Sequence, residues 1–245
     1  MKIPETIFLE ETESTNADLA ERLRQKNLPE FSTITSLWQK AGRGQGSNKW
    51  FSSRGKNLLS SILIYPYYIE AKDQFSITQA VSLSICDVLS EIMPEENIQI
   101  KWPNDIYVNQ KKIAGILIEN QIKGNQIAAS IIGIGLNVNE SDFPENLSMA
   151  VSMIKYTKRI INPSELLPKI CSKLETNLEW IKKNGPNHFL KAYLGKMYRF
   201  DTLSDYIYEG KRIRACIIGI DEYGRLLLKK QNTIITCDVR EISFV

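Results

Sequence analysis

The chain has 245 residues, of which 43% are hydrophobic, 9% aromatic and 24% charged, and this composition excludes a disordered or a fibrous protein. Its 31 basic and 28 acidic side chains leave a net charge of +3, which by itself predicts no nucleic-acid partner. His188 is the only histidine. A multi-histidine metal site is therefore excluded, and we expect catalysis without histidine.

The cysteines and the N-terminal residues indicate a cytoplasmic protein. The four cysteines are far apart, without a Cys-x-x-Cys pair, and are predicted to be reduced, packed thiols. The N-terminal segment has no apolar core of a signal peptide, and no run approaches the ~18 apolar residues that a membrane helix requires. We therefore expect neither secretion nor a membrane partner.

The first half of the chain alternates short β-rich runs with helical patterns. Strands are predicted from residue 7, over 33–39 and over 58–65, and helices over 16–25 and 74–93. Ser14 and Thr15 precede the first helix, where their side-chain oxygens can cap free backbone N–H groups. A glycine-rich, cationic loop is expected over 40–50, because its glycines and basic residues follow a strand directly.

The second half predicts a meander, a pair of helices and a small all-β region. Four β-like stretches over 98–102, 106–108, 113–119 and 126–138 are separated by short turns. Asn162 with Pro163 is expected to open a helix that ends near 183, and a second helix follows Pro186. From Tyr198 onward, strands and turns predict a β-barrel. The prediction is an α+β protein with a catalytic domain over 1–195 and a barrel over 196–245.

Polar groups gather at the ends of several predicted strands, and each has a plain structural alternative. The loop with Arg43 could bring backbone N–H groups to a ligand, or it could be a solvated surface loop. Asn104 and Asp105 after Pro103 could form a site or a tight turn, and Lys112 could be an ordinary turn lysine. Gly115 interrupts a strand, which predicts that another group approaches its backbone closely.

Five motifs in order resemble the biotin protein ligase family. They are ESTN at 13–16, GRGQG at 42–46 closing on Trp50, KWPND at 101–105, KIAGILIE at 112–119 and GIGLNVN at 133–139. The stretch GIDEYGRLLL at 219–228 is similar to the family's SH3-like domain. The resemblance implies a mixed or antiparallel sheet with helices on one face, related to class II aminoacyl-tRNA synthetases. The family's repressor members carry an N-terminal DNA-binding domain, for which this sequence has no room, so we expect no DNA partner.

The resemblance implies a two-step activity. Biotin and Mg·ATP give biotinyl-5′-AMP, and a lysine of a biotin carboxyl carrier protein then takes the biotin. Lys112, Arg43 and Asp105 match the catalytic positions, Asp105 also being the candidate for Mg²⁺. The implied biotin site is Ser14, Thr15, Asn16, Gln39, Gly42, Arg43, Gly44, Lys112 and Gly115. The implied ATP site is Arg43, Gln45, Trp50, Asn104, Asp105, Lys112 and Asn137.

Some alternatives stay open at the level of sequence. Gln45 stands where many family members have a second arginine, and Trp50 could cover the adenine or pack in the core. A lipoate or octanoate ligase is the rival activity, although it would not need the ureido-binding set of Ser14, Thr15 and Gln39. A biotin-sensing module without turnover is the rival of another class. The sequence does not decide between a monomer and a homodimer.

Overall fold

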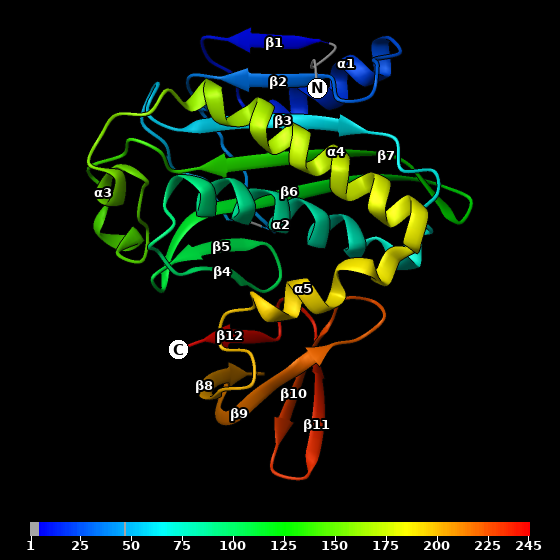
Figure 1. The fold of residues 1–245 in the computed structure, drawn as a ribbon, viewed down its shortest axis with the longest axis vertical. Helices are drawn as coiled ribbons and strands as arrows, with labels where there is room; N and C mark the ends of the chain where they lie inside the picture. The colour runs from blue at the N-terminus through cyan, green and yellow to red at the C-terminus, as the bar shows by residue number, and fades with distance from the viewer. Residues whose placement is uncertain (1–4, 47) are drawn as a thin grey trace.

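Two β-sheets built from consecutive parts of the chain form the molecule (Figure 1). The structure is a computed structural model that describes residues 5–46 and 48–245. The strands of the first sheet are β1 (Thr6–Leu9), β2 (Thr33–Ser36), β3 (Leu58–Ile64), β4 (Ile98–Lys101), β5 (Asp105–Val108), β6 (Lys111–Lys123) and β7 (Gln126–Leu136). Their order is β1-β2-β3-β7-β6-β5-β4. β1 pairs with β2 in parallel and the other pairs are antiparallel, so the predicted mixed sheet is confirmed.

The predicted meander is confirmed as β4 to β7, and its turns explain its tight connections. Asn109 and Gln110 join β5 to β6 with φ of 48° and 69°, and Gly124 has a φ of 65° in the turn between β6 and β7. Two-residue hairpin loops need such left-handed backbone to match the twist of the strands. β6 begins two residues before its predicted start and extends four residues beyond its predicted end.

The two long helices cover one face of this sheet and the first helix covers part of the other. α2 (Phe75–Ile92) packs against α4 (Leu166–Asn184) and against β4, β5 and β6. α1 (Thr15–Gln25) packs against β2, β3 and β7. On β3, Ile62 belongs to the core under the long helices, whereas its neighbour Leu63 packs with Leu19 of α1. The expectation of helices on a single face therefore holds for α2 and α4 but not for α1.

Shorter helical elements connect these parts. They are α3 (Ile154–Thr157), α5 (Leu190–Gly195) and 3₁₀ turns over Ala71–Asp73, Glu145–Leu147, Pro163–Glu165 and Pro186–Phe189. The predicted cap at Asn162 is confirmed, because its side chain accepts a hydrogen bond from the Ser164 backbone N–H at 3.2 Å. The predicted cap at Ser14 is wrong in part. Ser14 occupies the N-cap position of α1, but its side chain makes no capping hydrogen bond.

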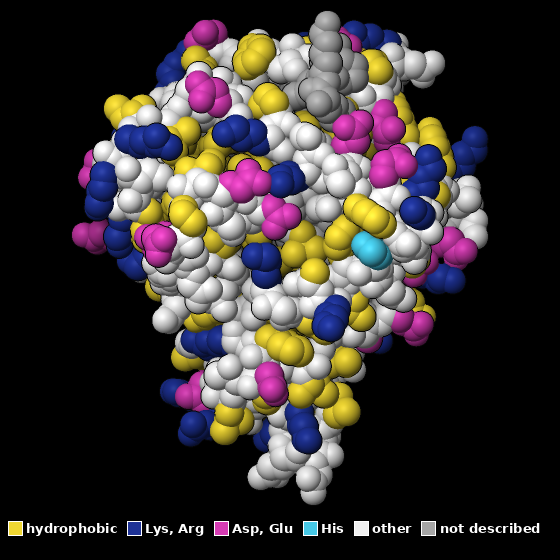
Figure 2. All heavy atoms as spheres, viewed as in Figure 1, with side chains coloured by type: hydrophobic (Ala, Val, Ile, Leu, Met, Phe, Trp, Pro, Cys, Tyr) yellow, Lys and Arg dark blue, Asp and Glu magenta, His cyan; other side chains and the backbone are white. Residues whose placement is uncertain are grey.

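The apolar character of α2 comes from its place in the core. The stretch 71–92 is long and apolar enough to cross a membrane by length and composition, yet 67% of its most apolar window is buried inside the protein. The outer surface of this side carries basic and acidic side chains interspersed with one another (Figure 2). All four cysteines are free thiols, and Cys86, Cys171 and Cys237 are buried as predicted, whereas Cys216 is partly exposed.

The second sheet is antiparallel and stands below the first in Figure 1. Its strands are β8 (Leu203–Tyr208), β9 (Lys211–Ile220), β10 (Leu226–Lys230), β11 (Thr233–Cys237) and β12 (Ile242–Phe244), in the order β11-β10-β9-β8-β12. One apolar cluster continues from the first sheet into this one. The Trp102 indole N–H also donates to the carbonyl of Gly224 at 2.8 Å. The boundary between 195 and 196 remains a prediction.

Candidate active site

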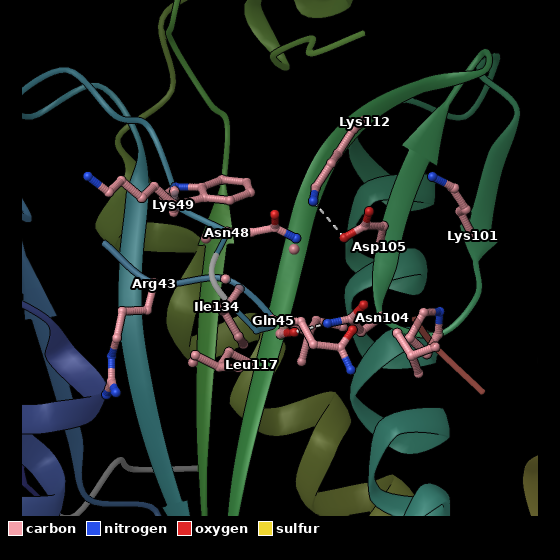
Figure 3. Close-up of a pocket in the computed structure, with 18 of the residues that line it drawn as sticks. Arg43, Gln45, Asn48, Lys49, Lys101, Asn104, Asp105, Lys112, Leu117 and Ile134 are labelled. Atoms are coloured by element: carbon pink, nitrogen blue, oxygen red, sulfur yellow. Dashed lines mark hydrogen bonds and ion pairs between the residues drawn. The ribbon is translucent and has the colours of Figure 1, made fainter. Parts of the chain in front are cut away.

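The pocket that gathers the predicted residues lies on the face of the first sheet opposite α2 and α4. It has a volume of about 290 Å³ and is shown in Figure 3. The start of α1, the loop over 39–50, the turn between β4 and β5, strands β6 and β7, and the end of the second sheet enclose it. The predicted residues that line it are Ser14, Thr15, Asn16, Gln39, Arg43, Gly44, Gln45, Trp50, Asn104, Asp105, Lys112 and Gly115.

Glycines on adjacent strands form the floor of this pocket. Gly115 of β6 pairs directly with Gly135 of β7, and the Trp50 ring lies against both. A β-carbon at Gly115 would stand 3.1 Å from that ring, and one at Gly135 would overlap it. The close approach predicted at Gly115 is therefore confirmed, but the group that approaches is Trp50. The same contact places Trp50 in the pocket floor. The ring is therefore packed against the sheet, as in one alternative, and also lines the pocket, as the other alternative requires.

Neutral polar groups occupy one end of the pocket. Gln39 Oε1 accepts hydrogen bonds from the Thr15 backbone N–H at 2.8 Å and from the Thr15 hydroxyl at 3.1 Å. The Ser61 hydroxyl donates to Asn16 Oδ1 at 2.6 Å, and Asn16 Nδ2 donates to Glu119 Oε2 at 2.6 Å. Because the Thr15 hydroxyl bonds Gln39 at the pocket, it does not cap the helix.

The glycine-rich loop folds back on itself as a narrow hairpin. The Trp50 N–H donates to the Gly42 carbonyl at 2.8 Å, and Arg43 forms an antiparallel bridge with Lys49. A β-carbon at Gly42 would stand 2.7 Å from the Trp50 carbonyl oxygen. Gly42 is thus needed to close the loop. The implied biotin site includes Gly42, but this residue is not among those that line the pocket.

Arg43 lies at the same end of the pocket as Asn16 and pairs there with Glu119, so this end holds an ion pair beside its neutral groups. The Arg43 guanidinium lies 3.5 Å from Glu119 Oε1, and Figure 3 shows it directed away from Lys112 and Asp105. The sequence instead expected Arg43 beside the carboxylate and phosphate groups of the substrates. Glu119 draws the guanidinium towards the α1 side because opposite charges attract at this distance.

The charged end of the pocket is built on β4, β5 and β6. Lys112 Nζ lies 2.7 Å from Asp105 Oδ1, and the two side chains point towards each other in Figure 3. Asn104 Nδ2 donates to the Ile116 carbonyl at 2.5 Å, which fixes the turn that carries Asp105. Lys112 Nζ also lies 5.6 Å from the centre of the Trp50 ring. The sequence offered a turn or a site at Asn104 and Asp105. In the structure these residues form a turn that also lines the pocket.

Asn137, which the resemblance implies for the ATP site, is not among the described residues that line this pocket. Its side chain is buried, and Nδ2 donates to the Val151 carbonyl at 3.1 Å. The segment after β7 forms hydrogen bonds with the segment over 151–154. Asn137 Oδ1 has no hydrogen-bond partner in the described part of the chain.

Sequence reasoning missed several residues that line the pocket. They are Asn48, Lys49, Lys101, Trp102, Pro103, Ile116, Leu117, Gly133, Ile134, Gly135, residue 239 and residues 242–244 of β12. The alternate glycines at 133 and 135 carried a usable signal, because residues two apart in a strand share a face. A β-carbon at Gly133 would stand 2.5 Å from Asn16 Oδ1. The contribution of the second sheet had no local signal, since it depends on packing between distant segments.

Comparisons with known proteins agree with this arrangement. Residues 8–137 match the model of the biotin/lipoate A/B protein ligase family. The bifunctional ligase/repressor BirA of Bacillus spizizenii is 33% identical over 233 residues, which are 90% of this chain and 68% of that protein. The chain belongs to the biotin protein ligases. The biotin--[acetyl-CoA-carboxylase] ligase of Paracoccus denitrificans is 30% identical, with 91% of this chain and 93% of that protein covered.

A solved biotin protein ligase has the same fold over its whole length. The ligase of Aquifex aeolicus, solved in complex with biotin and ATP, superposes with a TM-score of 0.80 at 28% identity. The match covers 98% of each chain, so it includes both sheets. The predicted fold class is confirmed.

Proposed function

We propose that this biotin protein ligase activates biotin with ATP to biotinyl-5′-AMP and pyrophosphate, and then transfers biotin to a lysine of a biotin carboxyl carrier protein. One observation carries the proposal. A single pocket holds neutral hydrogen-bonding groups, beside the Arg43–Glu119 ion pair, at one end and the Lys112–Asp105 pair at the other. Biotin has the same polarity, with a neutral ureido ring at one end and a carboxylate at the other.

The neutral end suits the ureido ring. This ring offers N–H donors and a carbonyl acceptor, which hydroxyl and amide side chains can satisfy. The Ser14 hydroxyl makes no capping bond and lines the pocket beside Thr15 and Asn16. These residues would select biotin over a fatty acid, because a buried polar group left without a partner costs about 1–3 kcal/mol.

The charged end suits the adenylation step. The biotin carboxylate must attack the α-phosphate of ATP, and two unit charges 4 Å apart repel by about 4 kcal/mol at an effective dielectric constant of 20. The Lys112 ammonium offsets this repulsion as charge gathers in the transition state. The Trp50 indole N–H is buried without a partner in the described structure and stands available to a nucleotide or to the acyl-adenylate.

A magnesium ion fits this end only in company with the nucleotide. Asp105 is the one carboxylate among the described lining residues, and the described chain has no group of three metal-binding side chains. Magnesium in such sites is held by one or two carboxylates together with phosphates and water. Asp105 would hold it here, and the ion would offset phosphate charge.

The transfer step needs a deprotonated amine. The neutral amine nitrogen of the acceptor lysine attacks the acyl carbon, the bond between that carbon and the AMP oxygen breaks, AMP leaves, and the nitrogen loses one proton to become the amide N–H. His188 lies exposed on the 186–189 turn, outside the pocket, and we assign it no catalytic role. Asp105 and solvent are the proton acceptors that the pocket offers.

The decisive experiment supplies labelled biotin, ATP and a biotin carboxyl carrier domain and measures label on the carrier together with released pyrophosphate. We expect both products with biotin and neither with lipoate or octanoate. Preference for lipoate or octanoate would favour the rival ligase. Biotin binding without pyrophosphate would favour the sensing module, although binding alone does not need groups that neutralise phosphate.

A further inference from the structure

Lys101 is a cation of the pocket that the proposed steps leave unused. It ends β4, and its ammonium lies 5.0 Å from the ring centre of Phe244 and 5.3 Å from that of Tyr107. Within residues 5–46 and 48–245, no acidic oxygen lies within 4.0 Å of Lys101 Nζ, and its ammonium donates no hydrogen bond. Figure 3 shows it beyond Asp105 as seen from Lys112.

This environment is unfavourable for a cation without a ligand. Burial lowers the pKa of Lys101, and Asp105 opposes that shift only in part. Burial also raises the pKa of Tyr107 to about 12, so its phenol stays neutral and supplies no counter-charge. Aromatic rings stabilise an ammonium by cation–π attraction, but they leave its hydrogen-bond donors unused. An incoming anion would satisfy them.

The order of charges along the pocket identifies that anion. Arg43, Lys112, Asp105 and Lys101 follow one another across Figure 3, from the neutral end to the far end. In phosphoryl and nucleotidyl transfer, the attacking and the leaving oxygen stand on opposite sides of the phosphorus. With biotin at the neutral end and the α-phosphate at Lys112, the leaving group emerges on the side of Lys101.

We infer that Lys101 binds the pyrophosphate moiety, as the β- and γ-phosphates of ATP and as the leaving group of the adenylation step. The inference rests on the proposed function. In this step the bond between the α-phosphorus and the bridging oxygen breaks, and the electron pair stays with pyrophosphate. Lys101 donates hydrogen bonds to that anion and takes no proton from it. Phe244 of β12 closes over the same ammonium, so the site uses both sheets.

The matched variants are Lys101→Met, Lys101→Arg and, as a control, Lys123→Met, which changes an exposed lysine at the end of β6. Three reactions are compared. They are biotinyl-AMP formation from biotin and ATP, its reversal by inorganic pyrophosphate, and biotin transfer to the carrier from preformed biotinyl-AMP. Only the first two contain the pyrophosphate moiety.

We expect Lys101→Met to raise the KM for ATP and for pyrophosphate by about tenfold or more, the size expected for one lost charge-assisted hydrogen bond. Transfer from preformed biotinyl-AMP and the Kd for biotin should stay within about twofold of the parent. Lys101→Arg should recover part of the loss because it keeps the charge. The control should match the parent in every assay.

An unchanged KM for pyrophosphate, or an equal loss in the transfer step, would overturn the inference. Calorimetric titration of the full-length protein with inorganic pyrophosphate tests Lys101 without any acid substrate. If the parent binds pyrophosphate and Lys101→Met does not, the site stands even if biotin proves to be the wrong acid. Should Lys101→Met fail to fold, Lys101→Gln gives the same comparison.

Discussion

The two faces of β6 and β7 differ in composition, because one is apolar and the other carries glycines that line the pocket. Residues of one face, among them Ala114, Ile132 and Leu136, are buried in the core under α2 and α4, and Ile116 and Ile134 of this face also border the pocket. The alternating residues Gly115, Leu117, Gly133 and Gly135 face the pocket. Neighbours along the chain, one residue apart, thus belong to the core and to the site.

This difference shows how one sheet supports both stability and binding. Glycine weakens a strand because it has no side chain to pack, and three glycines on one face would be costly in an isolated sheet. Here the opposite face buries a continuous apolar layer, and the open face accepts the Trp50 ring and the Asn16 amide. Changes to the two faces should therefore separate function from stability.

The largest effect on function is expected from Lys112→Ala on the pocket face. Loss of a preorganised cation should slow biotinyl-AMP formation by ~100-fold or more, while the melting temperature changes little because the side chain is partly exposed. Pre-steady-state formation of biotinyl-AMP is the measurement. Lys111→Ala, at the neighbouring position, is the control, and a Lys112→Ala protein as fast as the parent would refute the assigned role.

Glu140, which lies outside the pocket, tests how much a buried charge contributes to stability. Its carboxylate, buried beyond β7, accepts hydrogen bonds from Lys56 Nζ and the Ser53 N–H, each at 3.0 Å. Burial alone would raise its pKa, but these bonds and the charge of Lys56 outweigh burial, and the pKa of Glu140 is lowered from 4.5. The folded protein therefore favours the ionised form of Glu140.

We expect Glu140→Gln to lower the free energy of unfolding by about 1.5–3 kcal/mol at pH 7, the range for hydrogen bonds to a charged group. A lowered pKa contributes stability above about pH 4.5, the ordinary value, and this contribution fades as the pH falls through the folded-state pKa. Urea unfolding of parent and variant between pH 7 and 3 measures the difference in their free energies of unfolding. If this difference does not become smaller in acid, the stabilising effect does not come from the charge of Glu140.

Gly135→Ala and Ile132→Val form the direct comparison between the faces. The alanine β-carbon would overlap Trp50, so the ring must move, and displacement of a group that lines the site should reduce kcat/KM for ATP by about tenfold or more. Ile132→Val removes one buried methylene and should lower stability by about 0.5–1.5 kcal/mol with unchanged kinetics. Steady-state kinetics and urea unfolding of both variants check this. Equal kinetic losses in the two would show that the faces are not separate.

The smallest effect is expected at the loop over the pocket. Gln45 lines the pocket with a neutral amide, and an arginine there could form a charge-assisted bond to the acyl-adenylate phosphate. A gain of about 1 kcal/mol corresponds to roughly fivefold slower release of biotinyl-AMP from Gln45→Arg. Stopped-flow dissociation measures it, with Gln121→Arg on exposed β6 as the charge control. Equal release rates would show that the loop does not retain the intermediate.

Much of the local structure followed from the sequence because its causes are local. The turn at 109–110, the cap at Asn162 and the extent of β7 each depend on a few neighbouring residues. Other side-chain contacts depended on distant residues. Ser14 and Thr15 look like helix caps until Gln39 bonds the threonine hydroxyl, and only the fold shows that Arg43 pairs with Glu119.

The sequence by itself determined the family, the order of the main elements and most of the residues that meet in the pocket, because motifs and periodicity are written along the chain. Only the tertiary structure decided that Asn137 bonds Val151 and that Phe244 reaches Lys101. Both contacts join segments far apart in sequence, where packing and desolvation choose the neighbours. Local pattern carries no information about such choices, and for that reason the second sheet's share in the pocket became visible only in the folded protein.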